Sequence, residues 1–177
     1  MNRELKSILI KERENYISHY ASAKQYLIGR FVHDALQIYR FFKALRQEEY
    51  YQKKGKKLLS LWYGRKAGIR GERLGYFVSP GCLGEGVVFY HKGSIIINHR
   101  SVIGSGCRFH GDNCVGNDGI SEKCPVLGKN VDVGIGAKII GDVTLADGII
   151  IGANAVVTKS FSEPGIVIAG VPARRIK

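Results

Sequence analysis

The sequence of 177 residues lacks the features of a membrane-spanning or zinc-binding protein. It has no run of about 18 apolar residues, which is roughly the length that a helix needs to cross a bilayer. Residues 1–15 carry acidic side chains and no long apolar run, unlike a secretory signal. The cysteines, Cys82, Cys107, Cys114 and Cys124, form no CxxC pair, so no metal site is expected. These absences predict a cytosolic protein with free thiols.

Proline is scarce, with four residues in the chain and none before Pro80, so nothing interrupts a helix in the first part. Apolar residues there recur at the spacing of one helical face. They are Ile8, Ile10, Tyr16, Ile17, Tyr20, Leu27, Phe31, Ala35, Ile38, Phe42 and Leu45. The pattern predicts two or three helices up to about residue 66, followed by a linker over residues 67–75.

Negative charge is scarce in the same part of the chain. Residues 1–75 carry 17 Lys and Arg against 7 Asp and Glu, whereas residues 76–177 carry 10 against 8. Such a basic surface either meets an anionic partner or is a solvated helix face. The basic and apolar run at residues 53–66 therefore has two interpretations, contact with an anionic membrane surface or docking on the protein itself. No nucleic-acid partner is expected.

The second part of the chain contains a repeat of six residues. One phase of the repeat is aliphatic or aromatic, at Ile97, Ile103, Phe109, Val115, Leu127, Val133, Ile139, Leu145, Ile151 and Val157. A period of six fits neither an amphipathic helix nor one long strand. It predicts short strands joined by turns, three to each coil of a triangular prism, with the repeated side chains pointing inward.

The repeat is interrupted once, between Val115 and Leu127. No apolar residue of the series stands at position 121, and residues 117–125 are rich in turn formers. We expect a loop that leaves the prism at this point. Loops on rigid scaffolds frequently carry function.

Two segments near the end of the chain resemble the hexapeptide-repeat acyltransferases: IGANAVVTKSF at residues 151–161 and GIVIAGVPARRIK at residues 165–177. Within that family the chain is similar to the serine acetyltransferase-like branch associated with bacterial polysaccharide biosynthesis. The resemblance implies a mainly β fold, a left-handed parallel β-helix over residues 76–177, preceded by an α-helical region over residues 1–75. It also implies acetyl-CoA as co-substrate and a homotrimer with active sites between neighbouring prisms.

His91 is the candidate catalytic base. An alcohol is a poor nucleophile at neutral pH, and an imidazole is well suited to remove its proton during attack on a thioester. His91 stands six positions before Ile97, where the repeat asks for an apolar inward residue, so it either marks a local bulge or serves chemistry. The segment YHKGSIIIN matches the element that carries the base in the serine acetyltransferases. The carboxylates that could orient His91 are Glu85, Asp112 and Asp118.

The remaining site residues follow from the resemblance, position by position. Beside the acceptor it places Tyr90, His110, Asp118, Lys123 and Cys124. Along acetyl-CoA it places Ile135, Gly136, Ala137, Ala153, Thr158, Lys159 and Arg174. Serine acetyltransferases have an aspartate where this chain has Tyr90, and an arginine and a histidine where it has Lys123 and Cys124. These departures favour a sugar hydroxyl over serine as the acceptor.

The sequence therefore predicts an acetyl-CoA-dependent O-acetyltransferase acting on a sugar or polysaccharide intermediate, with serine O-acetylation in cysteine biosynthesis as the alternative. A zinc enzyme of the carbonic-anhydrase kind shares this fold but needs three convergent histidines, and the spacing of His91, His99 and His110 does not match it. A non-catalytic scaffold is the remaining alternative. The expected location is the cytoplasm, with peripheral contact at the inner face of the membrane and with polysaccharide-assembly enzymes.

Overall fold

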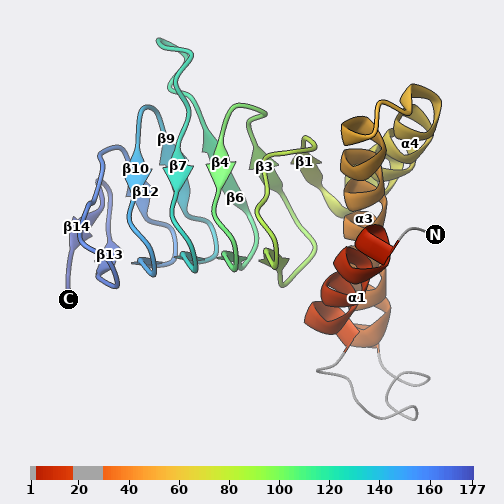
Figure 1. Cartoon of the computed structure of the whole chain (residues 1–177). Coiled ribbons are helices and arrows are strands. Elements are labelled where there is room, and N and C mark those ends of the chain that lie inside the picture. The colour runs from red at the N-terminus through yellow and green to blue at the C-terminus, as the bar shows by residue number, and fades with distance from the viewer. Residues whose placement is uncertain (1–2, 18–29) are drawn as a thin grey trace. The chain divides into compact units, whose positions relative to one another are not determined.

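The computed structural model describes residues 3–17 and 30–177, and the chain divides into two compact units, Met1–Gly75 and Tyr76–Lys177. The first unit is helical and the second is built of short strands (Figure 1). The described part of the first unit contains α1 (Arg3–Ile17), α3 (Arg30–Lys53) and α4 (Lys57–Leu74), and α3 packs against both other helices. No helix in the described ranges has the length and the hydrophobicity that crossing a membrane requires.

Aromatic side chains form the contact between α1 and α3. The ring of Tyr16 lies 5.4 Å from that of Phe42, which also meets Phe41 edge to face at 5.4 Å. A buried ion pair crosses the same contact, with Arg46 Nε 2.8 Å from Glu12 Oε1. Because both charges are removed from water, the pair fixes how the two helices align more than it adds stability.

The buried face of α1 differs from the apolar helical face that the sequence predicts. Leu5 and Leu9 are buried, whereas Ile10 is 46% exposed, so the prediction for Ile10 is wrong. The physical reason is the helical repeat, since a residue next to Leu9 is rotated by about 100° from the face that Leu5 and Leu9 share. Tyr20 and Leu27, which the sequence places on the same apolar face, lie outside the described residues.

Residues 67–75 do not form the predicted linker, because α4 continues to Leu74. Ala67, Gly71 and Leu74 are buried at the spacing of one helical face, so the small residues allow close packing and do not break the helix. The helix ends at Gly75, whose φ of 81° is typical of a residue that follows a helix C-terminus.

The second unit is a stack of coils with three walls of strands, and neighbouring strands pair in parallel except β13 and β14 (Figure 1). The first wall contains β1 (Tyr76–Val78), β3 (Ile95–Ile97), β6 (Asn113–Gly116), β9 (Lys138–Ile140) and β12 (Val156–Val157). The second contains β4 (Val102–Ile103), β7 (Val126–Leu127) and β10 (Thr144–Leu145). The third contains β2 (Val88–Phe89), β5 (Arg108–Phe109), β8 (Asp132–Val133), β11 (Ile150–Ile151), β13 (Val167–Ala169) and β14 (Arg174–Arg175).

The predicted inward residues of the six-residue repeat are confirmed. All ten are at most 3% exposed. The strand register stacks them coil upon coil, as in the column of Ile97, Val115 and Ile139. Burial of each such side chain stabilises the fold by roughly 1.5–3 kcal/mol, so the column is the main source of stability in this unit.

The corners of the prism require backbone conformations that favour glycine and asparagine. Gly136 has a φ of 74°, and Asn154, one coil further on, has a φ of 56°. A Cβ atom added to Gly136 would lie 2.0 Å from Asn154 Oδ1. The asparagine side chain therefore fills the space that the glycine leaves open.

The predicted loop at residues 117–125 is confirmed. It follows β6, precedes β7 and extends away from the prism (Figure 1). Within it, the N–H groups of Ser121 and Ile120 donate to Asp118 Oδ1 at 2.8 and 2.9 Å. These two hydrogen bonds lower the pKa of Asp118 and give the loop a defined turn.

Candidate active site

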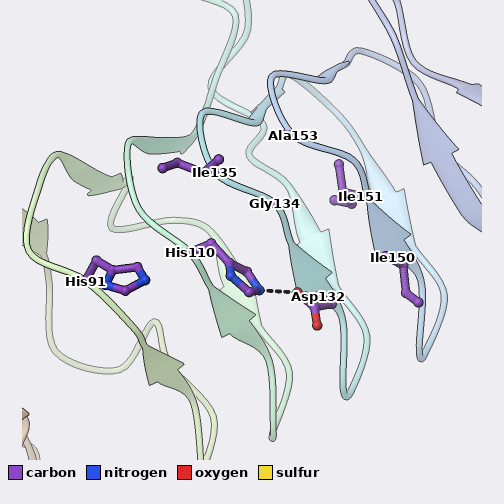
Figure 2. A pocket seen from close by; sticks show the side chains of 8 residues that line it. All are labelled: His91, His110, Asp132, Gly134, Ile135, Ile150, Ile151 and Ala153. Carbon is purple, nitrogen blue, oxygen red and sulfur yellow. Dashed lines mark hydrogen bonds and ion pairs between the residues drawn. The ribbon is translucent and has the colours of Figure 1, made fainter.

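A groove of about 460 Å³ runs along the outside of the third wall, beside β5, β8 and β11. Its lining residues are His91, His110, Asp132, Gly134, Ile135, Ile150, Ile151 and Ala153. Figure 2 shows the two imidazole rings toward one end of the groove and the aliphatic side chain of Ile150 toward the other. The groove therefore combines titratable groups with an apolar floor.

His91 does not occupy the inward position that counting back from Ile97 suggests. Phe89 is the inward residue, because it pairs in register with inward Phe109. Eight positions separate Phe89 from Ile97, whereas six separate Phe109 from Val115 on the next coil. The corner after Phe89 is thus two residues longer, and this bulge carries the exposed His91 out of the core.

The backbone of His91 is fixed from inside the prism. The hydroxyl of buried Tyr76 donates to the main-chain oxygen of His91 at 2.8 Å. Further along the bulge, Gly93 has a φ of 136°, and the N–H of Ser94 donates to Asp112 Oδ1 at 3.2 Å. These contacts hold the longer corner in one conformation, so the imidazole projects from a defined position.

The imidazole of His110 has a partner that the sequence did not reveal. Its Nε2 lies 2.8 Å from Asp132 Oδ1 (Figure 2). Arg108 Nη2 lies 3.0 Å from the other carboxylate oxygen, Asp132 Oδ2. An ionised carboxylate only accepts hydrogen bonds, so Nε2 of His110 carries the proton. In the neutral ring this leaves Nδ1 as an acceptor.

Two of the predicted acceptor residues, Tyr90 and His110, lie side by side. Their ring centroids are 4.8 Å apart and tilted by 41°, because the strand register sets Tyr90 beside His110 on successive coils. Tyr90 does not line the groove itself. Its ring restricts the movement of the His110 imidazole from one side.

None of the three carboxylates predicted to orient His91 contacts its imidazole. The Asp112 carboxylate accepts from Ser94, while the Asp118 carboxylate accepts from its own loop. No hydrogen bond joins Glu85 to His91. Within residues 3–17 and 30–177, the His91 imidazole has no hydrogen-bond or ion-pair partner.

The loop residues Asp118, Lys123 and Cys124 do not line the groove of their own chain. The Nζ atom of Lys123 lies 2.5 Å from Asp142 Oδ2, and this contact raises the pKa of Lys123. The loop joins the first wall to the second, whereas the groove follows the third wall. The predicted acceptor residues therefore fall into two separate groups within one chain.

The predicted acetyl-CoA residues are also divided. Ile135 and Ala153 line the groove. Ala137 is fully buried, so its methyl group belongs to the core and not to the groove. The remaining residues lie outside the groove lining: Gly136 at a corner, and Thr158, Lys159 and Arg174 on the exposed surface.

The sequence interpretation missed Asp132, Gly134, Ile150 and Ile151 of the groove. A signal for Asp132 was present, because Arg108 and Asp132 each precede an inward residue on successive coils of one wall. Opposite charges at such positions become cross-strand neighbours. The long loop between them obscured the relation, since it makes their separation larger than one regular coil.

No protein-family model matches the chain. Over 172 residues the chain is 25% identical to a serine acetyltransferase of Buchnera aphidicola, covering 94% of this chain but only 60% of that protein. The serine acetyltransferase of Brucella abortus in complex with coenzyme A has a TM-score of 0.74 at 20% identity, covering 99% of this chain and 68% of that one. The Neisseria gonorrhoeae serine acetyltransferase in complex with serine has a TM-score of 0.71 at 20% identity, covering 98% and 69%.

The second unit is a left-handed parallel β-helix. This is the fold of the serine acetyltransferases to which the structure is similar, and together with the helices that precede it the predicted fold class is confirmed. The chain spans less than two thirds of the Buchnera relative's length. The similarity to these proteins therefore establishes the fold of this chain and not its activity.

The prediction of a sugar or polysaccharide acceptor is wrong. The relative and the solved neighbours described above are all serine acetyltransferases, and none belongs to polysaccharide biosynthesis. That prediction rested on Tyr90 in place of an aspartate, and on Lys123 and Cys124 in place of an arginine and a histidine. The structure places other charged groups, Asp132 with Arg108 behind it, at the groove itself.

Proposed function

We propose that this protein is an acetyl-CoA-dependent serine O-acetyltransferase. The observation that carries the proposal is the groove in which His91 and His110 lie beside an apolar floor, on a β-helix of the fold found in the serine acetyltransferases. A slim apolar chain such as the pantetheine arm fits along Ile135, Ile150 and Ala153. The histidines then lie where a thioester and a hydroxyl would meet.

His91 is the general base in this proposal. Its imidazole removes the hydroxyl proton of serine while the serine oxygen attacks the thioester carbonyl carbon. The carbon–sulfur bond breaks, and the CoA thiolate leaves and takes up the proton from the imidazolium. The exposed position of His91 on a fixed corner supports this role, because the ring must reach a substrate outside the prism.

His110 holds the acceptor. Because Asp132 accepts a hydrogen bond from Nε2–H, the Nδ1 atom of the neutral ring is free to accept a hydrogen bond from the serine ammonium group. Asp132 keeps a negative charge close to that ammonium, and Arg108 keeps Asp132 in place. In this proposal His110, which the resemblance placed beside the acceptor, acts together with Asp132, which it did not.

In this proposal the other predicted site residues act either on the groove of a neighbouring copy of the chain or on the phosphates of CoA. A homotrimer would bring the loop residues Asp118, Lys123 and Cys124 of one copy toward the groove of another. Such an assembly would cover outward apolar side chains of the walls, among them Ile96, Val102 and Val126. For the cofactor, Thr158, Lys159 and Arg174 are exposed and free of the core, as contacts to the phosphates require.

Two further predictions concern the surroundings of the protein. Leu58, Leu61 and Trp62 are exposed on α4, within the basic run at residues 53–66. The segment docks on its own unit through Tyr63, which stacks on Tyr51 of α3, while these three side chains stay outside that contact and favour an additional contact with another surface. A cytoplasmic location and an anionic membrane surface stay predictions.

The proposal is tested by incubating the full chain with acetyl-CoA and L-serine. We expect serine-dependent release of the CoA thiol and formation of O-acetylserine, detected by mass spectrometry. D-serine and L-alanine are the matched controls, since the first changes the geometry and the second removes the hydroxyl. Absence of O-acetylserine at millimolar serine, with CoA binding intact, would exclude serine as the acceptor.

A further inference from the structure

Three arginines meet in a small cavity of the helical unit, apart from the groove. Arg40 extends from α3, while Arg70 and Arg73 extend from α4, and Gln37 and Leu74 complete the lining. The cavity has a volume of about 180 Å³. It lies within the first unit, so its geometry does not depend on the second.

The three arginines line this cavity without a carboxylate among the lining residues. Among the described residues, no Asp or Glu oxygen lies within 4.0 Å of Arg40, Arg70 or Arg73 in an ion pair. The positions outside the description, residues 1–2 and 18–29, contain no Asp or Glu in the sequence. The cavity therefore has a surplus of positive charge that the unit itself does not neutralise.

The surplus has an electrostatic cost. Burial and the nearby positive charge of Arg40 lower the pKa of Arg70. The C-terminal end of α4 favours a cation at Arg73, but Arg40 lies within α3 and gains nothing from that helix dipole. An anion placed among the three side chains would relieve the repulsion.

We propose that this cavity binds a small doubly charged oxyanion, inorganic phosphate or the phosphate group of a small phosphomonoester. Guanidinium groups form paired hydrogen bonds that match the oxygens of a phosphate. Three of them suit a dianion better than a single carboxylate. The cavity volume suits one phosphate group with a small substituent. This site is independent of the acetyl-transfer proposal.

Titration calorimetry of the full chain with inorganic phosphate at low ionic strength tests the site. We expect binding that weakens with added salt, and Arg70→Gln to reduce the affinity roughly tenfold or more, as loss of a charge-assisted hydrogen bond predicts. Arg40→Lys keeps the charge but loses the paired donors, so it should give a smaller reduction. Arg65→Gln, on the same helix and outside the cavity, is the matched control.

Glycerol 3-phosphate distinguishes the two sources of the phosphate group. Tighter binding of the ester than of inorganic phosphate would assign the site to a phosphomonoester, and the reverse to free phosphate. The proposal is overturned if wild-type protein does not bind either compound. It is also overturned if Arg70→Gln, folded by circular dichroism, binds both as tightly as Arg65→Gln does.

Discussion

His110 and Asp132 are joined across two coils of the prism by a hydrogen bond of 2.8 Å between Nε2 and Oδ1. The second oxygen of Asp132 is held by Arg108 at 3.0 Å. The carboxylate is therefore fixed at both ends, and it determines which nitrogen of His110 carries the proton. His91, which shares the groove, has no such partner within the described residues.

Replacing the carboxylate tests the role of this pair. We expect Asp132→Asn to raise KM for serine roughly tenfold or more, since a hydrogen bond to a charged group is lost from acceptor binding. The affinity for CoA should stay within twofold of wild type, because the apolar floor is unchanged. Steady-state kinetics and calorimetry give the two values.

Glu72→Gln is the matched control for that variant. Glu72 is exposed on α4 and does not line either cavity. It should leave KM and CoA affinity unchanged. An unchanged KM for serine in Asp132→Asn would show that the pair does not hold the acceptor.

The inward column should dominate the stability of the second unit. Phe109 is fully buried and meets Phe89 edge to face, with ring centroids 5.4 Å apart. We expect Phe109→Ala to lower the free energy of unfolding by about 3–5 kcal/mol, since little of the resulting cavity can collapse. Val171→Ala, at a position that is 72% exposed, should cost far less in urea unfolding. Equal losses would contradict the inward assignment.

Corner geometry gives a paired prediction. Gly136 and Gly119 have similar φ values, 74° and 78°, but only a Cβ at Gly136 would meet Asn154, at 2.0 Å. Gly119→Ala should cost about 1–2 kcal/mol, the cost of the left-handed conformation alone. Gly136→Ala should cost more, because Asn154 must also move. Thermal unfolding of the two variants compares them directly, and a smaller effect at Gly136 would refute the corner account.

The thiol of Cys107 should resist modification in the folded protein. Burial, the largest influence, raises the pKa of Cys107 to about 11. We expect no alkylation by iodoacetamide at pH 8 until urea unfolds the chain, as mass spectrometry can record. Because the pKa rises on folding, the associated stability is complete below the ordinary thiol pKa of 9.0 and is lost as the pH rises toward 11. Rapid alkylation in the native state would contradict this burial.

The column of inward residues could be predicted from sequence because a constant period of six needs no knowledge of which coils touch. The place of His91 could not, since counting back from Ile97 assumes that every corner has the same length. The corner after Phe89 is longer, and only the strand register shows it. A constant period of six therefore identifies the core residues but misplaces His91, which lies on the longer corner.

The groove was predictable in part. His91, His110, Ile135 and Ala153 follow from the resemblance and do line it. Asp132 was missed because the loop at residues 117–125 separates it from Arg108 by more than one regular coil. The acceptor was predicted wrongly for a related reason. The prediction compared single positions along the sequence, whereas the charged pair of Asp132 and Arg108 forms only when successive coils stack.

If His91 removes the serine proton, the His91→Asn variant must turn over far more slowly than wild type. We expect kcat to fall roughly 100- to 10,000-fold, the usual contribution of a general base. CoA affinity, measured on the same preparations by calorimetry, should stay within twofold. Serine-dependent thiol release at the wild-type rate by His91→Asn would show that His91 is not the base.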